Sequence, residues 1–263
     1  MNQHTLRVLE YDKIKDIVAG YAASESGRAV VAELQPATDS GTVAALLEET
    51  EEVVRILQSG ERPPLEGIHD IRQAVEKLGV PGSMLSPAEL LDSATTLGAG
   101  RRLKAFFQRF EGEGAGRSAV AAPRLCARAV HIRLLKHIED AVLAAVDERA
   151  EVKDSASPAL RRIRKQVNRM RDEILDRMSR ILQDGGTQKV VQEPVVTIRD
   201  DRYVLPLKPN FRQSLKGVVH GQSGSRATLF VEPLEVLEQN NRLAELRMEE
   251  REEVERILRA LTS

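Results

Sequence analysis

Four residues of the types that hydrolases use occur close together late in the sequence, at His220, Ser223, Ser225 and Glu232. A serine hydrolase needs a nucleophile, a base and a group that orients the base, and its serine often sits in a G-x-S-x-G turn. The sequence has no such turn. We therefore expect a polar turn here, with His220 held by a structural partner at a strand end.

Phosphate-loop and metal chemistry are also poorly supported. The run 221–225, GQSGS, shares only its glycines with a phosphate loop, and G-x-x-x-x-G-K-[ST] occurs nowhere in the chain. Cys126, His131 and His137 do not have metal-ligand spacing. Asp200-Asp201 is expected to be a turn. We predict no catalytic site and no cofactor in this chain.

The residues with the best-supported chemistry are seven cations between positions 187 and 226, which are Lys189, Arg199, Arg202, Lys208, Arg212, Lys216 and Arg226. Only Glu193, Asp200 and Asp201 oppose them in this stretch. Phosphate contacts require cations but no base-reading geometry. Tyr203 and Phe211 are the only aromatic residues among them, so the pattern favours nucleic-acid backbone contacts over base recognition.

The formal net charge of -1 conceals an uneven distribution. Residues 151–226 carry 16 basic and 9 acidic side chains, a net of +7, whereas 1–150 and 227–263 each carry a net of -4. Part of the excess lies at 161–171, where six basic residues crowd one helical segment. That segment is either a solvated face partly paired with the glutamates that follow residue 233, or a polyanion-binding surface.

Two long helical segments position the cations. In 156–184, Leu160, Ile163 and Val167 begin an apolar seam with steps of three and four residues, and Gly185-Gly186 ends the helix. In 232–261, a seam is expected through Leu237, Asn241, Ala244 and Met248. Because the two segments have similar lengths and flank a non-helical insert, we expect them to pair antiparallel.

The insert is predicted to form a small antiparallel sheet. One hairpin is expected around 199–201 and another around 221–226, where turn residues separate short apolar runs. Pro206 is typical of an edge strand or a bulge.

The composition indicates a mainly α protein: 41% of residues are hydrophobic, 30% are charged and only 3% are aromatic. Short helices are predicted before residue 35, one helix is predicted to begin at Ser86-Pro87, and a single helix is expected over 123–146. Segment 111–117 is predicted to be a flexible loop. The single cysteine suits a cytoplasmic protein, and neither a leader nor a membrane segment is recognisable.

Five segments together resemble the bacterial MutS family, and within it the MutS-two branch associated with suppressing recombination. They are LEYDKIKDIVAGYAASESGRAVVAEL (9–34), DSASPALRRIRKQVNRMRDEI (154–174), DDRYVLPLKPNFR (200–212), GVVHGQSGSRATLFVEP (217–233) and LEQNNRLAELRMEEREEVERIL (237–258). The segments cover most of the chain and occur in family order.

The resemblance implies a helical core at 1–153, an outgoing lever helix at 154–184, a β clamp at 185–232 and a returning lever helix at 233–263. It implies a clamp that holds DNA, with branched recombination intermediates as the expected substrate. The family's ATPase domain, with its ATP and Mg²⁺, and its Smr endonuclease domain would follow Ser263, so this fragment is not expected to be an enzyme. Family members carry an H-D-Q-S-S-S-G-A-T-like turn, where this chain has Gly221, Gly224 and Arg226.

Three functions remain open at this point. The first is DNA binding through the seven cations. The second is a dimerisation or mechanical scaffold with little DNA affinity, since the returning segment is acidic and a homodimer is possible in the full-length protein. The third is contact with rRNA during rescue of collided ribosomes, which the resemblance also suggests.

Overall fold

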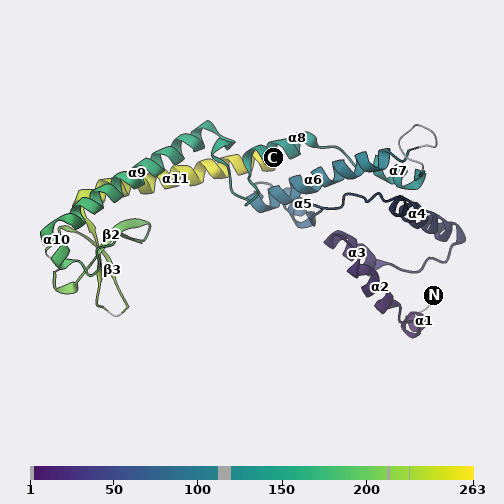
Figure 1. The fold of residues 1–263 in the computed structure, drawn as a ribbon, viewed down its shortest axis with the longest axis horizontal. Helices are drawn as coiled ribbons and strands as arrows, with labels where there is room; N and C mark the ends of the chain where they lie inside the picture. Colours follow the sequence, from purple (N-terminus) through teal and green to yellow (C-terminus); the bar gives the residue numbers. More distant parts are fainter. Residues whose placement is uncertain (1–2, 112–119, 212–213, 225) are drawn as a thin grey trace. The chain divides into compact units, whose positions relative to one another are not determined.

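The computed structural model describes residues 3–111, 120–211, 214–224 and 226–263. The described chain is mainly helical and has one small four-stranded antiparallel sheet, as predicted from the sequence (Figure 1). It divides into two compact units, Met1–Lys153 with Leu258–Ser263, and Asp154–Ile257. None of the helices in the described ranges is long and apolar enough to cross a membrane.

The first unit is entirely helical. Its helices are α1 (Gln3–Val8), α2 (Tyr11–Gly20), α3 (Glu25–Glu33), α4 (Ser40–Gln58), α5 (Arg72–Leu78), α6 (Pro87–Gln108), α7 (Pro123–Val130) and α8 (Lys136–Ala145). The predicted start of α6 is confirmed. Ser86 accepts a hydrogen bond from the Glu89 N–H while Glu89 accepts from the Ser86 N–H, so two otherwise unsatisfied donors are capped.

A small core lies where α4, α6 and α7 meet, around Ile56, Phe106, Phe110 and Cys126. The Glu52 carboxylate is buried there and accepts hydrogen bonds from the backbone N–H groups of Arg124 and Leu125, at 3.1 and 2.9 Å. An acidic side chain at a helix N-terminus is stabilised by the exposed N–H groups of the first turn. Local sequence patterns do not predict this contact, because 72 residues separate Glu52 from Arg124.

The single helix expected over 123–146 is wrong: α7 ends at Val130 and α8 begins at Lys136. The Lys104 ammonium group donates to the carbonyls of Val130 and Ile132, at 2.9 and 2.8 Å, and so satisfies the backbone at the break. Most of the loop predicted at 111–117 lies outside the described residues.

The second unit begins with a short 3-10 turn, Asp154–Ala156, and the long helix α9 (Pro158–Gln183), followed by α10 (Gly185–Val190). Ser157 caps α9 by accepting from the Leu160 N–H at 2.9 Å. Asp184 ends α9 and caps α10, accepting from Gly186 and Thr187. The predicted stop at this position is confirmed, but a further short helix follows it.

The sheet contains β1 (Thr197–Arg199), β2 (Arg202–Leu207), β3 (Gly217–Gln222) and β4 (Leu229–Pro233) in the order β1-β2-β4-β3, and a 3-10 turn, Pro209–Phe211, follows β2. Both predicted hairpins are present. Asp200 and Asp201 have φ values of 48° and 62°, as a two-residue turn between twisted strands requires.

Pro206 lies on an inner strand of this order, where it pairs with Phe230 of β4, so the edge-strand expectation is wrong. The strand tolerates proline here because the pairing of β2 with β1 ends at Val204. Beyond that point the Pro206 carbonyl accepts from the Gln192 N–H at 2.7 Å, and proline needs no N–H for this bond.

Helix α11 (Leu234–Thr262) follows β4 directly and runs antiparallel to α9. Ser157 and Arg164 near the start of α9 bond to Glu253 and Glu250 late in α11, at 2.6 and 2.7 Å. Bonds from Arg256 and Ser157 hold the pKa of Glu253 at about 2, well below its usual 4.5. Towards the sheet, a shared core of the two helices and the strands includes Ile174 and Met178.

The seam expected on α11 is wrong by one residue. Val236, Asn240 and Leu243 are buried, whereas Asn241 is exposed and Met248 is 60% exposed. Both sets have steps of three and four residues, so periodicity cannot distinguish them. The contacts of Asn240 with the sheet select the observed face.

Candidate nucleic-acid interface

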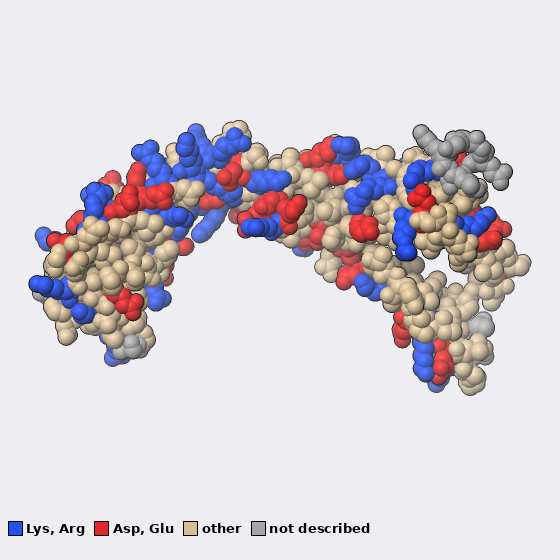
Figure 2. Space-filling view, viewed as in Figure 1, with Lys and Arg blue, Asp and Glu red and all other residues tan. Residues whose placement is uncertain are grey.

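The sheet module consists of α10 and the four strands, residues 185–233, and it carries all seven predicted contact residues. Six of them are described, and Arg212 lies outside the described residues. Figure 2 shows Lys and Arg side chains at several separate positions around this end of the second unit. The six described cations are therefore spread over one module and do not form a single compact cluster.

Lys189 and Lys208 lie close together at the end of α10. Lys208 Nζ donates to the Lys189 carbonyl oxygen at 3.2 Å, and the Lys208 N–H donates to the Val190 carbonyl at 3.0 Å. An isolated bridge between Val191 and Leu207 fixes the same two segments. The chain thus brings together two cations that are 19 residues apart in sequence.

Arg199 and Arg226 lie at the two hairpins. The Arg199 guanidinium sits over the Phe230 ring, 4.2 Å from its centroid, so the ring fixes the side chain while the charge stays exposed. Arg226 has a φ of 59°, and its N–H and carbonyl are held by Ser223 and Gln222. Lys216 is exposed just before β3.

These five cations have no carboxylate within ion-pairing distance among the described residues. One of the two acidic residues between Arg199 and Arg202 is engaged elsewhere: Asp201 pairs with Arg247 and Arg251 of α11, at 3.3 and 3.7 Å. Arg247 also donates to the Asp201 carbonyl at 3.1 Å. Helix α11 therefore pairs with one of the two carboxylates of this turn.

Arg202 differs from the other predicted contacts because it belongs to a buried polar network. Its Nη1 lies 2.8 and 3.1 Å from the two oxygens of Glu232, and its Nη2 donates to Asn241 Oδ1 at 2.7 Å. Glu232 is completely buried. The Arg202 charge is thus already neutralised inside the protein.

Two further donors complete the coordination of Glu232. His220 Nε2 lies 2.5 Å from Glu232 Oε2, and Asn240 Nδ2 donates to Oε1 at 2.8 Å. His220 has the structural partner expected from the sequence. Ser223 Oγ accepts from the Thr228 N–H at 3.1 Å, so this serine contributes to the turn. We name Arg202, His220, Glu232, Asn240 and Asn241 the Glu232 network.

Asn240 also joins α11 to β2. Its amide donates to the Tyr203 carbonyl and accepts from the Tyr203 N–H, both at 3.1 Å. In the observed register Tyr203 would lie opposite Pro233, where β4 ends and no N–H is available. The side-chain amide substitutes for the missing strand partner. The sequence did not predict this contact, because 37 residues separate Asn240 from Tyr203.

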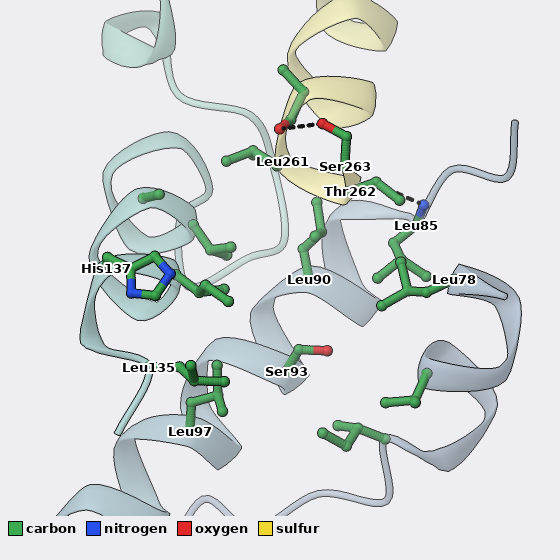
Figure 3. A pocket seen from close by; sticks show the side chains of 16 residues that line it. Leu78, Leu85, Leu90, Ser93, Leu97, Leu135, His137, Leu261, Thr262 and Ser263 are labelled. Carbon is green, nitrogen blue, oxygen red and sulfur yellow. Dashed lines mark hydrogen bonds between the residues drawn. The ribbon is translucent and has the colours of Figure 1, made fainter. Parts of the chain in front are cut away.

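The first unit has an apolar hollow of about 540 Å³ (Figure 3). Leucines line much of it, and Thr262 Oγ1 at one edge accepts from the Leu85 N–H at 3.2 Å. His137 is the one titratable side chain in its lining. Over the described ranges, no group of three or more His, Cys, Asp or Glu residues is placed to hold a metal. The hollow therefore offers apolar packing rather than acid–base chemistry.

No protein-family model matches the chain. Curated relatives named Endonuclease MutS2 match it along its length. The protein of Symbiobacterium thermophilum is 41% identical over 263 residues, which is 100% of this chain and 32% of the relative. That of Alkaliphilus oremlandii is 39% identical over 258 residues, covering 98% and 32%, and that of Bacillus cytotoxicus is 39% identical over 262 residues, covering 100% and 33%.

The chain spans about one third of the length of these curated relatives. At this identity, over so long an alignment, the similarity reflects common descent and one fold for the matched part. The resemblance identified from the five segments is supported: this chain is a homologue of part of the MutS2 proteins and is related to the MutS2 family over its whole length.

Proposed function

We propose that this chain is the core, lever and clamp region of a MutS2 protein, and that the sheet module is a clamp that binds DNA through its phosphate backbone. In this proposal α9 and α11 are the two lever helices. The observation that carries it is a set of five cations on the sheet module that lack carboxylate partners among the described residues: Lys189, Arg199, Lys216 and Arg226, which are exposed, and Lys208, which is half-buried.

The chemistry of the module favours binding that tolerates any base sequence. Tyr203 is buried and the Phe230 ring is covered by Arg199, so neither is free to stack on a base. Phe211 is 40% exposed and is a single aromatic side chain. Backbone binding by cations weakens steeply with salt because it releases condensed counterions. We therefore expect salt-sensitive binding with little sequence preference, and branched recombination intermediates as the preferred DNA.

The longer protein would supply the chemistry. We propose that it is an endonuclease, as the relatives are named, and also an ATPase that suppresses recombination, which the resemblance to the MutS-two branch implies. ATP and Mg²⁺ would bind outside this chain in our proposal, since the Gly-rich sequence with a lysine that holds nucleotide phosphates does not occur in it. In this proposal the residues of this chain hold the DNA.

The test is a fluorescence-anisotropy titration of the chain against a branched DNA and a linear duplex. In the variant K189E/K216E/R226E, three exposed cations are reversed. We expect affinity for both DNAs to fall at least about 100-fold at low salt, since several phosphate contacts become repulsive. Arg202 is left intact because reversing it would place a carboxylate against Glu232.

A matched control variant, R28E/R55E/R133E, makes the same change in net charge at exposed positions of the first unit. Its affinity should stay within a few-fold of the starting chain. Unchanged affinity of the K189E/K216E/R226E variant would refute the clamp proposal. If ribosomal particles compete for the same cations more strongly than branched DNA, the polyanion is rRNA instead.

A second candidate function, a dimerisation or mechanical scaffold, is favoured by a separate observation. Helices α2 to α4 expose large apolar side chains, including Ile17 at 64% and Leu47 at 64%. Large exposed apolar patches commonly mark interfaces with other proteins. This function would be compatible with weak DNA affinity.

A further inference from the structure

The first half of α9 is strongly basic. From Pro158 to Arg171 it holds six cations and no carboxylate, and Asp172 is the first acidic residue of the helix. The six are Arg161, Arg162, Arg164, Lys165, Arg169 and Arg171. This segment lies apart from the sheet module, and the proposed clamp makes no use of it.

Arg164 is occupied within the protein. It pairs with Glu250 of α11 at 2.7 Å and with Asp154 at 2.5 Å, and its side chain is 27% exposed. These contacts hold the start of α9 against α11. One of the six cations, Arg164, is therefore accounted for by its contacts within the pair of helices α9 and α11.

Four other cations form a continuous outward face, which we name the α9 stripe: Arg161, Arg162, Lys165 and Arg169, all exposed. At 3.6 residues per turn they fall within an arc of about 100° and extend about 12 Å along the axis. The buried residues Ile163 and Ile174 lie on the opposite side of the helix. The stripe thus faces away from the core that α9 shares with the sheet.

Internal partners do not account for the stripe. In the described part of the chain, Arg161, Arg162 and Lys165 have no carboxylate within ion-pairing distance. Arg169 pairs with Glu173, but both side chains are well exposed, and such pairs contribute little to stability. Asp172, Glu173 and Asp176 make the next part of the same face acidic, so the stripe has a sharp end. Figure 2 shows basic side chains gathered over this part of α9.

We propose that the α9 stripe is a second nucleic-acid contact surface, which binds backbone phosphates of duplex DNA separately from the sheet module. Cations three and four residues apart on one helix face repel each other, and a polyanion relieves that repulsion. Guanidinium groups also match phosphate geometry with two donors each. Duplex DNA carries one charge per about 1.7 Å of axis, so a surface about 12 Å long meets several phosphates.

This inference rests on the proposed DNA-binding function, so its experiment separates the two surfaces. The slope of log affinity against log salt is measured for the whole chain with a fluorescein-labelled blunt duplex. In R161Q/K165Q the slope should become shallower by about 2, because each lost phosphate contact removes about 0.9. Affinity at about 0.1 M salt should fall at least ten-fold.

The matched control is R242Q/R256Q, which makes the same change in net charge on α11. Both arginines are already paired with glutamates, Arg242 with Glu245 and Arg256 with Glu253. Its slope should equal that of the starting chain. Circular dichroism of each variant should give the same helical content, since all four positions are solvent-facing.

The outcomes distinguish the two proposals. An unchanged slope for R161Q/K165Q, with binding lost in K189E/K216E/R226E, overturns the stripe and leaves the clamp. A shallower slope for R161Q/K165Q, with K189E/K216E/R226E unaffected, supports the stripe and overturns the clamp. Failure of the unaltered chain to bind the duplex at low salt overturns both.

Discussion

The buried carboxylate of Glu232 explains why one predicted DNA contact is different from the rest. Removing a charge from water is costly unless charged and polar partners replace the solvent. Arg202, His220 and Asn240 supply these partners around both oxygens. Because Arg202 is paired with Glu232, the electrostatic attraction of the sheet module for a polyanion depends on the other cations of the module.

Replacing Glu232 with Ala should lower the free energy of unfolding by about 2–4 kcal/mol, because Arg202 and His220 lose their partner and a cavity remains. The measurement is urea denaturation followed by circular dichroism. Glu235, an exposed residue in the first turn of α11, provides the control, and Glu235→Ala should cost less than about 0.5 kcal/mol. Equal effects of the two substitutions would exclude a structural role for the network.

The pairing of β3 with β4 depends on close backbone approach at one glycine. A Cβ atom on Gly217 would lie 2.3 Å from the Glu232 carbonyl oxygen and 2.7 Å from Val231 Cγ1. Both distances are too short, and the carbonyl belongs to the strand backbone, which cannot move away without breaking the ladder. Gly217 therefore positions β3 against the same residue that organises the buried network.

Gly217→Ala should destabilise the chain by about 1–3 kcal/mol, the usual cost of forcing extra volume into a packed site. Gly224→Ala is the control, since a Cβ there meets nothing within 4 Å. Thermal unfolding of the two variants, compared in one buffer, measures the difference. A Gly217→Ala chain as stable as Gly224→Ala would contradict the close approach.

At the scale of the whole molecule, the excess of basic residues and the exposed apolar side chains of α2 to α4 lie in different units. The net excess of basic residues lies at 151–226, within the second unit, whereas residues 1–150 carry a net of -4. The large exposed apolar side chains of α2 to α4 lie in the first unit. The basic excess of the second unit suits a polyanion, and the exposed apolar side chains of α2 to α4 suit an apolar partner.

If the apolar faces of α2 to α4 are an interface between copies of the chain, mass should rise with concentration in multi-angle light scattering. The variant I17K/L47K should then remain monomeric, because burying two ammonium groups in an apolar interface is unfavourable. Ile198→Lys, at an exposed position of β1 in the second unit, should leave the association unchanged. A single mass at all concentrations for the unaltered chain would refute this scaffold role.

Local patterns in the sequence determined much of the secondary structure. The capping residues Ser86 and Glu89, the stop at Asp184 and the two-residue turn at Asp200-Asp201 each act through their own backbone neighbours. Such signals are visible without knowledge of the fold, because they satisfy hydrogen bonds within a few residues. The excess of cations over acids at 187–226 was equally evident from the sequence.

Tertiary structure alone decided which of these cations remain available and which face of α11 is buried. Glu232 captures Arg202 across 30 residues, and Asn240 reaches Tyr203 across 37. Two seams on α11 have the same spacing, so only the sheet packed against the helix selects between them. The reason is that a contact between residues far apart in sequence produces no local pattern. Caps, turns and charge runs, in contrast, are formed by adjacent residues and can be recognised directly.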